Sequence, residues 1–246
     1  MGAVEETSGG AIRYLYEDGV ATIVLATPDN ANRFTLAAMQ GWIAALEASH
    51  ADRAVVLLVR AEGEDFTLGR DQRERPQGVT RKESLSLILR ANELLATFPG
   101  ASIALVQGRA FGFGSGIALH CDITLAADDA TLGFDEVLHQ LAPLVVVDYL
   151  VDFVGRKVAA ELVMTGRSVP APEAHALGMV NRLVLSEDLE QAGAELVAHL
   201  RTLSAGALRL MKQYALDDAS GALADPGAEG VARLDAWIAA GRPDEV

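Results

Sequence analysis

The stretch VQGRAFGFGSGIALHCD, residues 106–122, begins as an apolar strand, turns through glycines and continues with the composition of a helix. Gly112, Gly114 and Gly116 stand at every second position of the turn. Such a turn aims the first N–H groups of the helix into the crevice above the strand end, and glycine lets the backbone approach a ligand. The stretch therefore predicts a strand–turn–helix unit suited to an anion, or to an oxygen that becomes one.

Several roles are compatible with such a glycine turn. A dinucleotide pyrophosphate is disfavoured because the spacing is G-x-G-x-G, whereas the dinucleotide fingerprint is G-x-G-x-x-G. A P-loop is excluded because no Gly-Lys-Ser/Thr follows. An oxyanion hole, which stabilises an enolate or a tetrahedral oxygen, remains open. Tight helix–strand packing without any ligand also remains open, and the turn alone does not decide between these two.

Predicted strands and helices alternate through the first three-quarters of the chain. A helix is expected over residues 80–98, where Thr80 and Glu83 form a capping-box pattern. From residue 186 onward the pattern is helical only. This order predicts an α/β class with a mainly parallel sheet in a core of residues 1–185, followed by a C-terminal helical region of residues 186–246.

Composition narrows the possible functions. The 246 residues carry a net charge of −14 and only three lysines, so binding to nucleic acid is not expected. No apolar run reaches about 18 residues, and the N-terminus has no apolar segment, so neither a membrane span nor a secretory signal is expected. Cys121 is the single cysteine, which excludes an internal disulfide and favours a cytoplasmic location. No cluster has metal-ligand spacing, so no metal is expected.

Three segments together resemble the crotonase (enoyl-CoA hydratase/isomerase) superfamily. Residues 101–137 are similar to its A-V-N-G-x-A-x-G-G-G-x-E-L-A-L-x-C-D and F-G-x-P-E motifs. Residues 154–184 follow its V-G-R-x-x-A-x-E-L-x-L-T-G pattern, and residues 55–71 follow V-V-L-T-G-x-G-x-x-F-x-A-G-x-D. The resemblance covers about residues 10–216. It implies a crotonase-like spiral of ββα units, with C-terminal helices that assemble a homotrimer or hexamer or cover the active site.

The resemblance also implies an acyl-CoA thioester as the substrate, with coenzyme A as part of that substrate and no separate cofactor. Members of the family hold the thioester oxygen, and the enolate formed from it, with two backbone N–H groups. The matching positions are Arg70 in LGRD and Phe113 in GFG. Further positions are expected to bind substrate, namely Leu68, Gly69, Gly112, Gly116 and His139.

One of two family glutamates is missing. Hydratases of the family place a glutamate on each side of a water; the first matches Gly116 and the second matches Glu136. Adding water needs two positioned acid–base groups, whereas moving a double bond needs one base and an oxyanion hole. Some Δ3-Δ2-enoyl-CoA isomerases of the family keep only the second glutamate. The pattern therefore favours an isomerase with Glu136 as its catalytic base and makes hydration doubtful.

Alternatives remain at this point. Hydration, decarboxylation or C–C hydrolysis would use the same oxyanion hole, and a non-catalytic acyl-CoA binder is favoured if the Phe113 ring fills the acyl pocket. Asp135 is a second candidate base if its segment is extended, and His120 is a candidate for the missing acid. The Arg70 side chain is a pocket residue, a cation for CoA phosphates or an ordinary surface charge. Lys212 is a further candidate phosphate contact.

Overall fold

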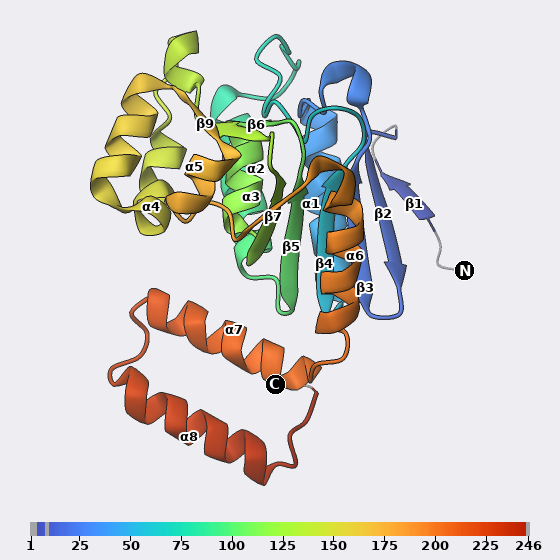
Figure 1. Cartoon of the computed structure of the whole chain (residues 1–246), viewed down its shortest axis with the longest axis vertical. Coiled ribbons are helices and arrows are strands. Elements are labelled where there is room, and N and C mark those ends of the chain that lie inside the picture. The colour runs from blue at the N-terminus through green and yellow to red at the C-terminus, as the bar shows by residue number, and fades with distance from the viewer. Residues whose placement is uncertain (1–3, 8–9, 245–246) are drawn as a thin grey trace.

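A seven-stranded sheet forms the centre of the computed structural model, which describes residues 4–7 and 10–244 (Figure 1). The strand order is β1-β2-β3-β4-β5-β7-β10. β1, β2 and β3 pair antiparallel, and β3 to β10 pair parallel, as the alternation predicts. The strands are β1 (Val4–Thr7), β2 (Ile12–Glu17), β3 (Val20–Leu25), β4 (Val56–Ala61), β5 (Ala101–Val106), β7 (Ile123–Ala127) and β10 (Arg182–Val184).

Helices cover both faces of this sheet. On one face α1 contacts β2 and β3, and α2 lies between α1 and α3. On the other face α6 contacts β4, β5 and β7, and Figure 1 shows it lying in front of the sheet. Every residue of β5 is buried, as expected for a parallel strand covered on both sides. The helices are α1 (Leu36–Ala51), α2 (Arg81–Ala96), α3 (Phe113–His120) and α6 (Leu189–Leu200).

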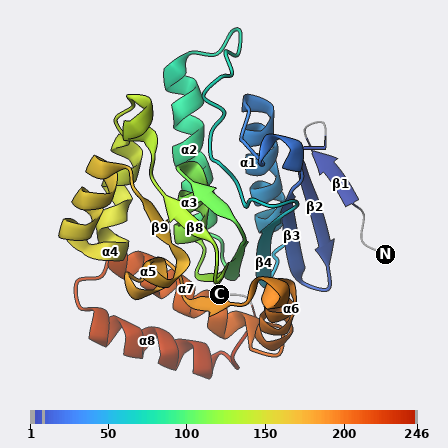
Figure 2. The same cartoon turned by 45° about the horizontal axis from the view of Figure 1, so that its top comes forward.

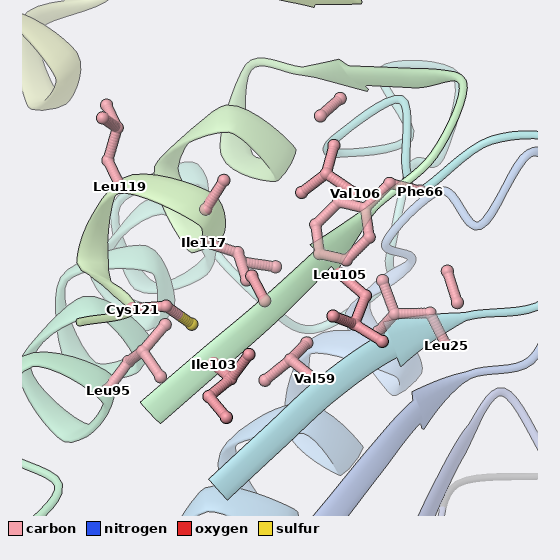
Figure 3. Packing of buried hydrophobic residues seen from close by; sticks show 14 of the residues in the cluster. Leu25, Val59, Phe66, Leu95, Ile103, Leu105, Val106, Ile117, Leu119 and Cys121 are labelled. Carbon is pink, nitrogen blue, oxygen red and sulfur yellow. The ribbon is translucent and has the colours of Figure 1, made fainter. Parts of the chain in front are cut away.

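The core between the sheet and the first helices is closely packed. Figure 3 shows Ile103 and Leu105 of β5 beside Ile117 and Cys121 of the α3 segment. Cys121 is a buried free thiol, and burial raises its pKa. The thiol therefore behaves as a small apolar group of the core.

A second, three-stranded sheet stands at the end of β5 that leads into the glycine turn. It consists of β6 (Arg109–Phe111), β8 (Thr131–Gly133) and β9 (Ser168–Pro170). We expected the residues of β6 to be a turn, and this expectation is wrong, because they pair with β8. The glycine turn is thus held on its strand side by a sheet of its own.

Two helices, α4 and α5, come after β8 in the chain, one on each side of β9. α4 (Leu144–Thr165) is interrupted at Gly155, whose φ is +75°. α5 (Ala171–Ala176) comes directly after β9. A 3₁₀ helix, Glu136–His139, lies between β8 and α4 and carries the candidate base.

The chain ends in a hairpin of two helices, α7 (Ala205–Ala219) and α8 (Pro226–Ala239). The region expected to be helical from residue 186 is therefore divided, and α7 begins anew with the Ser204 side chain accepting from the Ala207 N–H. Figures 1 and 2 show this hairpin standing away from the sheet, whereas α6 lies on it. Within residues 4–7 and 10–244, no helix combines the length and apolarity that crossing a membrane requires.

Candidate active site

A cavity of about 880 Å³ lies where the glycine turn meets two other segments, residues 68–88 and 135–149. This volume is in the range of pockets that bind small ligands. Apolar side chains of α2 and of the start of α4 contribute much of its wall. All but one of the predicted site residues line it, namely Leu68, Gly69, Arg70, Gly112, Phe113, Glu136 and His139.

Two backbone N–H groups at this cavity have no acceptor in the part of the chain that the structure describes. Phe34 pairs with the chain on both sides of Arg70, because its N–H donates to the Gly69 oxygen at 2.8 Å and its oxygen accepts from Asp71 at 3.0 Å. The Arg70 N–H therefore faces away from Phe34. Phe113 is the first residue of α3, so its N–H has no partner inside the helix. Neither N–H finds a hydrogen-bond acceptor among the described residues.

Gly69 brings these two N–H groups to one place. Its φ is +70°, and a Cβ on it would lie 2.6 Å from the Phe111 oxygen and 3.2 Å from the Phe113 nitrogen. Only glycine permits both the conformation and the close approach. The peptide from Gly69 to Arg70 thus lies against the N-terminus of α3, where the helix dipole favours developing negative charge.

Gly112 leaves open the space beside the Glu136 carboxyl group. Gly112 has φ +53°, and a Cβ on it would lie 3.0 Å from Oε1 of Glu136. The Gly112 N–H donates to the Gly133 oxygen at 2.9 Å, which fixes the turn against β8. The glycine therefore leaves room for the carboxyl group one residue away from the free Phe113 N–H.

The Glu136 carboxyl group is largely removed from water. Its Oε2 is buried and has no hydrogen-bond partner among the described residues. Burial is the main cause of its raised pKa, and the Asp135 charge adds to it. A carboxyl group in this state is matched to proton transfer closer to neutral pH than an ordinary glutamate.

Tyr149 is the residue that sequence reasoning missed. A Cβ on Gly116 would lie 2.9 Å from the Tyr149 hydroxyl, so the phenol occupies the space that a side chain at position 116 would enter. Gly116, expected to bind substrate, does not line the cavity, whereas Tyr149 does. Burial and the Glu136 charge raise the Tyr149 pKa, so the phenol stays protonated.

Other candidate acid–base groups are engaged elsewhere. Asp135 accepts from His139 at 3.1 Å, and its neighbour starts a 3₁₀ helix, so the assumed extended segment is wrong. His120 donates from Nδ1 to the Gly116 oxygen at 2.7 Å and packs against the Tyr149 ring. Burial lowers the His120 pKa, which keeps the ring neutral.

The side chains of the two oxyanion candidates point in different directions. The Phe113 ring packs edge-on against Phe34, with centroids 5.0 Å apart, and is 6% exposed. It therefore belongs to the core and does not fill the cavity. Arg70 lines the cavity, and its guanidinium donates from Nη2 to Oγ of Ser84 at 2.7 Å. Lys212 pairs instead with Asp122 at the start of β7 and does not line the cavity.

Comparison with known proteins defines the class of this fold and site. The chain overlays a provisionally named enoyl-CoA hydratase from Thermobifida fusca YX, solved with acetoacetyl-CoA, with a TM-score of 0.84 and 28% identity. The match covers 96% of this chain and 98% of that one, and a second structure of a T. fusca protein so named holds CoA. The α/β class with mainly parallel strands and C-terminal helices is confirmed, and it is the crotonase fold.

Sequence comparison identifies the family. The enoyl-CoA hydratase/isomerase family model matches residues 16–227. A Thermus thermophilus protein provisionally named an enoyl-CoA hydratase is 35% identical over 89% of this chain and 88% of its own length. Hydroxycinnamoyl-CoA hydratase-lyase of Pseudomonas fluorescens is 30% identical over 80% of this chain and 74% of its own. The chain belongs to the enoyl-CoA hydratase/isomerase family.

Proposed function

We propose that this chain binds acyl-CoA thioesters and is a Δ3-Δ2-enoyl-CoA isomerase with one glutamate base. The observation that carries the proposal is that Glu136 lines the same cavity as two backbone N–H groups without acceptors among the described residues, while Tyr149 takes the place of the first family glutamate beside Gly116. Coenzyme A enters as part of the substrate. The direct test is an assay with 3-enoyl-CoA and 2-enoyl-CoA on wild type and Glu136→Gln.

The proposed reaction moves one proton and one double bond. The thioester oxygen accepts hydrogen bonds from the Arg70 and Phe113 N–H groups. Glu136 removes a proton from C2 of the 3-enoyl group, and the electron pair forms a dienolate whose charge lies on the held oxygen. The protonated Glu136 then returns the proton at C4, which yields the 2-enoyl thioester and restores the carboxylate.

Tyr149 is the reason to prefer isomerisation over hydration, although the relatives compared above are named hydratases. Hydration requires, besides Glu136, a second group that positions the water. The space beside Gly116 holds a protonated phenol, and burial makes it a poor base. Decarboxylation and C–C hydrolysis would use the same N–H pair, and the assay on both thioesters separates them, because neither yields the 2-enoyl product.

Replacing Tyr149 with phenylalanine tests the one-base scheme. The phenol takes no proton in the scheme, so kcat for 3-enoyl-CoA is expected to change only a few-fold. The measurement is initial-rate kinetics on wild type and Tyr149→Phe. A loss of about 100-fold or more, the range of a general acid or base, would show that the hydroxyl transfers a proton and would contradict the scheme.

The pH dependence of kcat follows from the Glu136 environment. The base must be deprotonated, and its pKa is raised above the ordinary glutamate value of 4.5. We therefore expect kcat to fall as pH decreases through a midpoint above 4.5. A kcat–pH profile under saturating 3-enoyl-CoA measures this midpoint, and an acid limb at or below 4.5 would contradict the assignment.

The phosphates of coenzyme A need nearby cationic side chains, because the net negative charge of the chain repels them. Arg75 and Arg81 are exposed residues that line the cavity. Arg81 has no ion-pair partner in the part of the chain that the structure describes. We propose these two residues as phosphate contacts in place of Lys212, whose ammonium group is paired with Asp122.

The α7–α8 hairpin is proposed to carry self-association into a trimer or hexamer. Its apolar side chains are exposed, including Met211 at 59%, Val231 at 71% and Leu234 at 50%. Large exposed apolar groups on one element mark an interaction surface. Leu234→Glu is expected to lower the assembly to a smaller species in light scattering, with Asp235→Glu as the matched control. An unchanged mass for Leu234→Glu would contradict this role of α8.

A further inference from the structure

The proposed reaction uses the backbone of Arg70 and leaves its guanidinium without a task. Nη2 donates to Ser84, but Nη1 is buried and has no partner among the described residues. Leaving a buried donor of a charged group unpaired is costly. Both Arg70 and Ser84 line the cavity. The guanidinium thus keeps an unused hydrogen-bond donor within a residue pair that lines the cavity.

No carboxylate among the described residues hydrogen-bonds to the Arg70 guanidinium. Asp71 accepts from Arg73 at 3.0 Å. Glu74 accepts from the Leu36 N–H at 2.6 Å. Burial lowers the Arg70 pKa, and these two acids act against that effect at a distance. A guanidinium remains charged in proteins, so a partly compensated positive charge lies within a residue that lines the cavity.

We propose that Arg70 and Ser84 bind a carboxylate at the far end of the acyl group, so that CoA monothioesters of dicarboxylic acids are the preferred substrates. This inference rests on the proposed function, which places the thioester oxygen at the Arg70 N–H. The side chain of Arg70 separates that N–H from the guanidinium, so the carboxylate lies several carbons from the thioester. The Ser84 hydroxyl accepts from Nη2 and keeps its own hydrogen to donate to the same carboxylate.

The neighbours of this pair favour an acyl carboxylate over a CoA phosphate. Ser84 lies on α2 one turn before Ile88, and Leu85 follows it; all three line the cavity. Apolar walls suit the carbon chain of an acyl group. The exposed Arg75 and Arg81 remain for the phosphates, where water also reaches the ligand.

The test measures binding without turnover. Wild type is titrated by calorimetry with glutaryl-CoA and with valeryl-CoA, which have equal chain length and end in a carboxylate and a methyl group. A charge-assisted hydrogen bond to a carboxylate is expected to give glutaryl-CoA about tenfold or more tighter binding. Equal affinity for the two thioesters in wild type would overturn the inference, and this comparison needs no variant.

Variants then show which residues cause the preference for glutaryl-CoA over valeryl-CoA. Arg70→Met keeps the backbone N–H and is expected to bring the two affinities together, while Ser84→Ala reduces the ratio partly. Arg81→Met is the matched control, because it removes an arginine of the same cavity and is expected to weaken both thioesters equally. A ratio that Arg70→Met leaves unchanged would overturn the assignment.

Failure of this inference is distinct from failure of the proposed function. An enzyme that converts 3-enoyl thioesters ending in a methyl or a carboxylate with equal kcat/KM is an isomerase without the carboxylate site. An enzyme that binds glutaryl-CoA through Arg70 but converts neither 3-enoyl thioester has the site and lacks the proposed reaction.

Discussion

Replacing Glu136 with glutamine is expected to lower kcat for 3-enoyl-CoA isomerisation by about 10²- to 10⁴-fold, the range in which a positioned acid–base group contributes. The amide has nearly the same shape and fills the same space beside Gly112, but it cannot take a proton from C2. Because Glu136 is the one group that moves a proton in the scheme, no other side chain compensates. The conversion of 3-enoyl to 2-enoyl thioester, followed by absorbance of the conjugated product, measures the loss.

Loss of activity in this variant is not expected to come from unfolding. A carboxyl group with a raised pKa favours its protonated form in the folded state, so it costs stability as pH rises from 4.5 through that raised value. Glutamine removes the buried charge, and the free energy of unfolding at neutral pH is expected to equal or exceed that of wild type. Urea denaturation measures it.

Asp135→Asn is the matched control for Glu136→Gln. Asp135 lines the same cavity and precedes Glu136, but its carboxylate is engaged by His139. Its kcat is expected to stay within a few-fold of wild type. Equal losses in both variants would indicate a general effect of charge at the cavity and would contradict a single base at Glu136.

The sequence predicted the elements whose hydrogen bonds or apolar pattern lie within their own segment. The capping box at the start of α2 forms as expected, with Thr80 and Glu83 bonding each other's backbone N–H groups. The apolar strand expected at the start of the quoted stretch is β5, and all of it is buried. β6 and β9 have three residues each and exist because they pair with β8, so no local periodicity marks them.

The site shows the same division. The structure brings Arg70, Phe113 and Glu136, which the family motifs singled out, to one cavity. Tyr149 lies on a different helix from Gly116, and only the folded arrangement shows that its hydroxyl takes the place of a missing side chain. The roles of these residues remain predictions, and the kinetics above test them.

The second large effect is expected for Gly69→Ala, which should lower kcat by about 10²- to 10³-fold, the loss recorded when one oxyanion donor is removed. The added Cβ would lie 2.6 Å from the Phe111 oxygen, so the peptide from Gly69 to Arg70 has to move away from α3. That movement separates the two N–H groups, and the thioester oxygen can no longer accept from both.

Gly221→Ala provides the control for backbone strain alone. Gly221 has φ +72°, close to the +70° of Gly69, but no atom lies within 4 Å of its Cβ position. Replacing glycine by alanine in this left-handed conformation lowers the free energy of unfolding by about 1 kcal/mol at either site. Gly69→Ala is expected to lower the free energy of unfolding by about 2–4 kcal/mol in all, because the overlap of the new Cβ with backbone atoms adds to the strain.

The two glycine variants together separate catalysis from folding. Activity is measured per folded molecule, at a temperature where circular dichroism shows both variants native. If Gly69→Ala is native and retains wild-type kcat, the Arg70 N–H does not hold the reacting oxygen. If kcat falls while KM for the thioester changes little, the lost interaction belongs to the transition state, because binding of the ground state does not depend on it. That outcome places the dienolate oxygen between the loop at Gly69 and the first turn of α3.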